Sequence, residues 1–211
     1  MTQICPTITA YDTHDFRDQL TRLEGFAPRL HLDFMDGVFA PVRSINLIQA
    51  YWPQTAQIDL HLMYARPLEH IETLVSLKPD LVIVHAEASG DLAGMFEHLR
   101  RFGMKVGVAL LPPTRVQEAN KLVSLADHVL IFGGHLGYQG GTADLTQLKK
   151  VAEVRAIRSD IELGWDGGAD EHTINEIKNA GIDVINVGSA IHDTPDSQAA
   201  YEALTRKLTS A

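Results

Sequence analysis

Short runs of apolar residues recur along the whole chain, separated by segments that contain Gly, Pro or Asp. Runs of this length and composition predict β-strands. Two of them, at 80–87 and 104–111, are almost continuously apolar, which is typical of parallel strands covered on both faces. The predicted strands are 3–8, 29–33, 57–63, 80–87, 104–111, 128–134, 161–166 and 182–189.

Segments between these runs carry apolar residues at spacings of three and four, which predicts helices with one face against a sheet. Examples are 15–23, 68–77, 92–102, 116–125 and 173–180. Alternating strands and helices indicate a parallel sheet, either closed into a (β/α)8 TIM barrel or open and doubly wound. No Gly-x-Gly-x-x-Gly follows the first strand, and polar residues end several different strands, as in barrel enzymes. We therefore predict one TIM-barrel domain over residues 1–211.

Composition narrows the possible partners. With 45% hydrophobic and 21% charged residues, the chain is typical of a globular protein, and its net charge of −9 argues against a nucleic-acid or membrane partner. A phosphorylated ligand would have to be held locally, which backbone amides and helix N-termini can do. The single cysteine, Cys5, excludes an intrachain disulfide, and no stretch is apolar enough for a signal peptide or a membrane span. These features predict a cytoplasmic location.

Histidine and aspartate recur at the ends of three predicted strands. Side chains alternate along a strand, so His31 and Asp33 share one face, as do Asp59 and His61. With Asp166 at the end of the seventh strand, two imidazoles and two carboxylates could meet at one divalent ion, Zn, Fe, Mn or Co. A single histidine at a strand end is more often a hydrogen-bonded core residue. The conjunction favours a metal, because burying all four without a cation or an extensive hydrogen-bond network would be costly.

Glycines form a second pattern. Gly167 and Gly168 follow Asp166, and Gly188 and Ser189 end the eighth strand. The loops after strands seven and eight often bind phosphate in barrels, whereas each glycine alone would indicate only a turn. The glycine-rich segment 133–141 is either a surface loop or a loop that folds over a ligand, and composition leaves both open.

Together these motifs resemble the ribulose-phosphate 3-epimerase family, nearly from end to end and in the family's order. The segments that carry the resemblance are CPTI, HLDFMDGVFAP, DLHLM, VHAEAS, KVGVALLPPT, WDGG and VGSAI. The resemblance implies a homo-oligomeric TIM-barrel enzyme of pentose phosphate metabolism that epimerises C3 of a ketose phosphate.

The resemblance also implies roles for individual residues. One divalent ion would be held by His31, Asp33, His61 and Asp166. Asp33 would remove the C3 proton, Asp166 would return a proton on the opposite face, and the metal would stabilise the cis-enediolate between these steps. The expected substrate-binding residues are Thr7, Met35, His61, Met63, Gly137, Gln139, Gly140, Gly167, Gly168, Gly188 and Ser189.

The chain departs from the family pattern at several positions. Thr7 replaces a serine, and Phe132 replaces a methionine. In the sixth loop, where the family has Asn-Pro-Gly-x-Gly-Gly-Gln, this chain has His-Leu-Gly-Tyr-Gln-Gly-Gly at 135–141. Gly137 and Gly140 are the glycine matches, while Gln139 and Tyr138 offer side-chain donors and His135 a possible cation.

Two hypotheses follow. The first is an epimerase that interconverts D-ribulose 5-phosphate and D-xylulose 5-phosphate, or acts on a close ketose phosphate such as a hexulose 6-phosphate. The second is a divergent relative that binds a sugar phosphate without turning it over. The related decarboxylase motif, Asp-x-Lys-x-x-Asp, is not present, which argues against decarboxylation.

Overall fold

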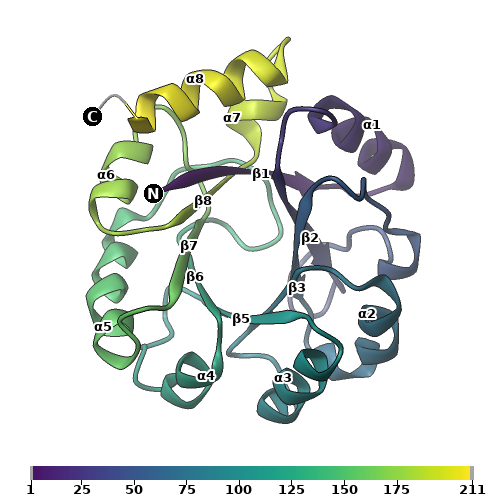
Figure 1. Cartoon of the computed structure of the whole chain (residues 1–211), viewed down its shortest axis with the longest axis vertical. Helices are drawn as coiled ribbons and strands as arrows, with labels where there is room; N and C mark the ends of the chain where they lie inside the picture. Colours follow the sequence, from purple (N-terminus) through teal and green to yellow (C-terminus); the bar gives the residue numbers. More distant parts are fainter. Residues whose placement is uncertain (1, 210–211) are drawn as a thin grey trace.

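A computed structural model describes residues 2–209. Eight parallel strands form a closed barrel in chain order, with the last strand paired to the first (Figure 1). The strands are β1 (Gln3–Thr9), β2 (Arg29–Met35), β3 (Gln57–Met63), β4 (Leu81–His85), β5 (Lys105–Leu110), β6 (His128–Phe132), β7 (Glu162–Asp166) and β8 (Val184–Val187). The predicted (β/α)8 barrel is confirmed.

Helices surround the barrel on its outside (Figure 1). They are α1 (Thr13–Leu23), α2 (Ile71–Leu77), α3 (Leu92–Arg101), α4 (Asn120–Leu125), α5 (Lys150–Ile157), α6 (Ile174–Asn179), α7 (Ser189–His192) and α8 (Ser197–Thr209), with short 3-10 segments η1 (Leu47–Gln49), η2 (Pro67–His70) and η3 (Leu145–Lys149). Within residues 2–209, no helix combines the length and the apolar character that crossing a membrane requires.

Alternation along each strand separates the outer core from the barrel interior. In β2, Leu30, Leu32 and Phe34 are buried and belong to the large apolar cluster that includes residues of the surrounding helices. The intervening residues His31 and Asp33 point inward, as the two-residue spacing predicts. The same strand therefore supplies apolar packing to the helices and polar groups to the interior.

Two predicted helices begin three or more residues before the α-helices of the structure. Segment 116–125 becomes helical only from Asn120, because backbone bonds from Glu118 to Arg115 and from Ala119 to Val116 form a tighter turn first. Segment 68–77 begins as a 3-10 turn and becomes α-helical at Ile71. These differences lie outside the barrel and do not move the strand ends.

The pairing of β2 with β3 sets the register of the polar residues. Asp33 lies opposite His61, and Met35 lies opposite Met63, one inward-facing layer closer to the carboxyl ends of the strands. Catalytic groups of barrel enzymes lie at this end. The fold therefore gathers the predicted polar residues where a barrel places its chemistry.

Candidate metal centre and substrate cavity

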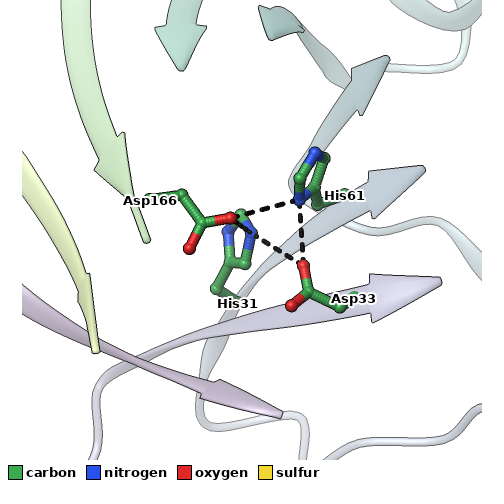
Figure 2. Close-up of side chains that lie close together, drawn as sticks. All are labelled: His31, Asp33, His61 and Asp166. Carbon is green, nitrogen blue, oxygen red and sulfur yellow. Dashed lines mark hydrogen bonds and ion pairs between the residues drawn. The ribbon is translucent and has the colours of Figure 1, made fainter. Parts of the chain in front are cut away.

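Four side chains from three strands converge at the carboxyl end of the barrel (Figure 2). His31 and Asp33 come from β2, His61 from β3 and Asp166 from β7, and one potential ligand atom of each lies within 4.8 Å of the other three. His61 Nδ1 is 2.9 Å from Asp33 Oδ1 and 3.6 Å from Asp166 Oδ2. His31 Nε2 is 3.3 Å from Asp33 Oδ1 and 4.0 Å from Asp166 Oδ2.

The pKa values of the two carboxyl groups in this cluster are shifted in opposite directions. Burial would raise the pKa of Asp33, but the adjacent His31 and His61 imidazoles outweigh burial and hold that pKa well below its usual value. Burial and the negative charge of Asp33 raise the pKa of Asp166 to about 6. Opposed shifts in neighbouring carboxyl groups are typical of an acid and base pair.

The donor set fits a divalent cation. Both histidines are fully buried, and the side chains of Asp33 and Asp166 are 9% and 12% exposed. His31 Nε2 makes no hydrogen bond to any described residue, although it faces both carboxylates. Two imidazole nitrogens and two carboxylate oxygens are a ligand set that Zn, Fe, Mn and Co accept. A cation bound among them would occupy the unpaired nitrogen and offset the repulsion between the carboxylates.

Hydrogen bonds outside the cluster orient two of its members. The Thr9 hydroxyl donates to Asp33 Oδ2 at 2.7 Å. The Asn186 amide lies 3.1 Å from His31 Nδ1, the ring nitrogen that faces away from the carboxylates. Such contacts fix the orientation and tautomer of a ligating histidine. Neither Thr9 nor Asn186 was predicted from the sequence, although the polar Asn186 interrupts an apolar strand and could have been noticed for that reason.

His85 at the end of β4 orients the other histidine. Its Nε2 lies 2.9 Å from His61 Nε2, and burial lowers the pKa of His85 to about 4, so its ring is neutral at pH 7. A neutral His85 can accept a hydrogen bond from His61 Nε2–H. His61 Nδ1 then presents a lone pair toward Asp33 and Asp166, which is the form that binds a metal. His85 lies in the VHAEAS segment, but no role was predicted for it.

A cavity opens above the cluster, and residues from several strand ends and loops line it. Asp33 and Asp166 form part of its wall, so both carboxylates can reach a bound molecule. The other lining residues are Thr7, Thr9, Met63, Phe132, Gly134, His135, Gly137, Tyr138, Gln139, Gly140, Gly167, Gly168, Ala169, Asn186, Gly188 and Ser189. Most of the predicted substrate-binding residues are therefore brought together around one space.

Two predicted substrate-binding residues are placed differently. Met35 is buried and packs with Ala40 and Met63. His61 is fully buried and faces the two aspartates from below the cavity, and neither Met35 nor His61 lines the cavity wall. Phe132 does line it, with its ring centroid 6.4 Å from that of His61.

The sixth loop is folded against its neighbours. Gly137 has φ +89, and an added Cβ would lie 2.9 Å from a methyl carbon of Val42, so the close approach requires glycine. The Tyr11 hydroxyl donates to the Gly137 carbonyl at 3.3 Å. His135 and Tyr138 are exposed at the rim of the cavity. Of the two interpretations left open for segment 133–141, the structure supports a loop that covers part of the cavity.

Comparison with known proteins identifies the family. Residues 3–192 match the sequence model of the ribulose-phosphate 3 epimerase family. The ribulose-phosphate 3-epimerase of Bacillus subtilis (strain 168) is 29% identical over 97% of this chain and 98% of its own length. The protein of the same name from Aquifex aeolicus (strain VF5) is 30% identical over 100% of this chain and 96% of its own.

Solved structures share the fold at lower sequence identity. A protein described as KGPDC from Streptococcus mutans has a TM-score of 0.76 at 8% identity, covering 100% of this chain and 98% of its own. A 3-hexulose-6-phosphate synthase has a TM-score of 0.73 at 18% identity, covering 98% of this chain and 100% of its own. These similarities support the barrel architecture, whereas the sequence relatives support the assignment to a family. The chain belongs to the ribulose-phosphate 3-epimerase family and is an isomerase of the epimerase class.

Proposed function

We propose that this protein inverts C3 of a ketopentose phosphate, interconverting D-ribulose 5-phosphate and D-xylulose 5-phosphate. The observation that carries the proposal is the pair of carboxylates, Asp33 from β2 and Asp166 from β7, which face one cavity from strands three places apart around the barrel (Figure 2). Inversion requires an acid and a base on the two faces of one carbon, and this pair can supply them.

The proton transfers can be assigned to side-chain atoms. Asp33 takes the C3 proton of D-ribulose 5-phosphate, and the electron pair of that C–H bond moves into a C2–C3 double bond while the C2 carbonyl oxygen becomes anionic. Asp166, in its protonated form, gives a proton to the opposite face of C3, and the carbonyl reforms. Thr9 holds Asp33 through Oδ2, so that Oδ1 faces the histidines.

We also propose that His31, Asp33, His61 and Asp166 hold one divalent ion. When bound, it would stabilise the negative charge that develops on the substrate oxygens. The buried His31 Nε2 without a hydrogen bond and the proximity of the carboxylates support this ligand set. Family membership supports a sugar-phosphate substrate, and the cavity lined by Gly168, Gly188 and Ser189 offers backbone donors for its phosphate.

The deciding experiment combines metal analysis with solvent exchange. Protein of measured metal content is incubated with D-ribulose 5-phosphate in D2O, and the products are followed by NMR. We expect D-xylulose 5-phosphate with deuterium at C3. Asp33→Asn should abolish the reaction, whereas the matched control Asp160→Asn, a side chain 75% exposed and outside the cavity, should not.

The outcome also separates the alternatives. Activity on a hexulose 6-phosphate but not on D-ribulose 5-phosphate would change the assigned substrate and leave the assigned epimerisation at C3 unchanged. If the wild type binds metal and sugar phosphate but gives neither product nor deuterium with any of these substrates, the protein binds its ligand without turning it over and the proposal is wrong.

A further inference from the structure

The side chain of Gln139 carries a buried donor with no acceptor. Its Nε2 is shielded from solvent and makes no hydrogen bond within residues 2–209. The amide lies against Gly188, where an added Cβ would be 2.5 Å from Gln139 Nε2 and 2.8 Å from its Cγ. A buried N–H group without an acceptor is destabilising, so it marks a place where an absent acceptor would be favourable.

The surroundings of this amide indicate which acceptor fits. Gln139 lines the same cavity as Gly168, from the loop after β7, and Gly188 and Ser189, after β8. Loops at these positions hold phosphate groups in many barrels. Among the described residues that line the cavity, none is Lys or Arg. An anion bound there is therefore held without Lys or Arg, by backbone amides, by side-chain amides and hydroxyls and by His135 at the rim, so each donor contributes a larger share of the affinity.

Neighbouring contacts hold Gln139 in position. Two residues before it, the Gly137 carbonyl accepts the Tyr11 hydroxyl. Directly after it, Gly140 approaches Ser189 so closely that an added Cβ would lie 3.3 Å from the serine Oγ. The segment is fixed on both sides of Gln139, so its amide is preorganised over the loop after β8 and loses little freedom when a ligand binds.

We infer that the Gln139 side-chain amide donates a hydrogen bond to the substrate's phosphate group and sets the preference for phosphorylated over unphosphorylated sugar. This inference rests on the proposed function, because it takes the substrate to be a ketose phosphate. The family pattern has glycine at this position. The side-chain amide of Gln139 therefore gives this chain a hydrogen-bond donor that the family pattern lacks.

The test measures phosphate binding apart from turnover. Isothermal titration with inorganic phosphate should give a dissociation constant about tenfold higher for Gln139→Ala, the loss expected for one hydrogen bond to an anion. Gln139→Glu, nearly the same in shape but negatively charged, should weaken binding further, by about a hundredfold. Gln117→Ala, an exposed glutamine before α4, is the matched control and should bind phosphate like the wild type.

Kinetics provide the second measurement. Gln139→Ala should raise KM for D-ribulose 5-phosphate about tenfold with kcat within about twofold, because the phosphate contact is the same in the ground and transition states. With unphosphorylated D-ribulose the variant and the wild type should have the same kcat/KM. A wild type that does not bind phosphate, or a Gln139→Ala variant that binds it as tightly or more tightly, would overturn the inference.

These results remain distinguishable from failure of the proposed reaction. A wild type that binds phosphate through Gln139 but does not epimerise any ketose phosphate would contradict the reaction and leave the contact standing. An active epimerase whose phosphate affinity and KM do not change in Gln139→Ala would contradict the contact and leave the reaction standing.

Discussion

The Thr9 hydroxyl donates a hydrogen bond of 2.7 Å to one oxygen of Asp33, and the other oxygen faces His61 at 2.9 Å. Thr9 therefore fixes the rotation of a carboxylate that, in the proposed mechanism, reaches both the metal and the substrate. We predict that Thr9→Val, which keeps the shape and removes the donor, lowers kcat/KM about tenfold, the value of one hydrogen bond to a charged group. The measurement is the initial rate at equal metal content.

Thr9→Ser is the control for this prediction, because it keeps the hydroxyl and removes only a methyl group. It should retain most of the wild-type kcat/KM. Equal activity of the serine and valine variants, with both loaded with metal, would show that the hydroxyl does not position Asp33.

Asn186 contacts His31 of the proposed metal site, as Thr9 contacts Asp33. A metal on His31 Nε2 requires a proton on Nδ1. The structure places Asn186 Nδ2 3.1 Å from Nδ1, and turning the amide by about 180° puts Oδ1 there instead, where it accepts a hydrogen bond from Nδ1–H. Asn186 Oδ1 makes no hydrogen bond among the described residues, so it is available for this role. Asn186→Leu should therefore weaken metal affinity about tenfold or more.

Competition with a chromophoric chelator measures that affinity without any turnover. Asn186→Asp, which retains an acceptor, is the matched variant and should bind metal at least as well as Asn186→Leu. Thermal unfolding in excess chelator checks that both variants fold. If the leucine variant matches the wild type in metal affinity, Asn186 does not select the tautomer of His31.

Replacing Asp33 or Asp166 should separate the reaction into its two proton transfers, one at each face of C3. In Asp166→Asn, Asp33 can still remove the C3 proton of D-ribulose 5-phosphate and return deuterium from D2O, but inversion should fall about a thousandfold. In Asp33→Asn, the exchange should instead favour D-xylulose 5-phosphate. NMR of the recovered sugars, at matched metal content, distinguishes the two. Labelling of the same epimer by both variants would contradict the assignment of the two faces.

The inward-facing positions of the site could be predicted from strand alternation alone. His31 and Asp33 are separated by one residue, so their shared face follows from local geometry and needs no knowledge of the barrel. Asp166 was predicted because it ends an apolar run and precedes two glycines. The structure confirms that these side chains meet at one end of the barrel.

The supporting contacts could not be predicted in the same way. Thr9 lies on β1, beside the Asp33 of β2, and Asn186 lies on β8, paired in register with Cys5. These neighbours depend on how far each strand is shifted when the barrel closes, which a single strand's pattern does not encode. The path of the loop around Gln139 is harder still to predict from the sequence. Packing against Tyr11, Val42 and Gly188 sets this path, and no repeating sequence pattern encodes it.

A second polar cluster, at the amino end of the barrel, predicts how stability depends on pH. Arg29 makes two hydrogen bonds to Glu162, of 3.0 and 2.9 Å, and His128 contacts the same carboxylate at 2.8 Å. Burial would raise the pKa of Glu162, but the hydrogen bonds from His128 and Arg29 outweigh it and hold that pKa well below its usual value. Because the folded-state pKa is lowered, this stabilisation is present above the unfolded pKa, about 4.3, and is lost as pH falls below it.

Glu162→Gln should therefore lower the free energy of unfolding by about 1–2 kcal/mol at pH 7, less than for a fully buried pair because the Glu162 side chain is 34% exposed. Urea unfolding at pH 7, 5 and 3 should give equal differences from the wild type at pH 7 and 5, and a smaller difference at pH 3. Glu97→Gln, an exposed glutamate on α3, should show no such trend. A difference for Glu162→Gln that stays constant down to pH 3 would mean that the carboxylate's charge does not stabilise the barrel, and that Arg29 is compensated by Asp59 alone, 2.7 Å from its Nε.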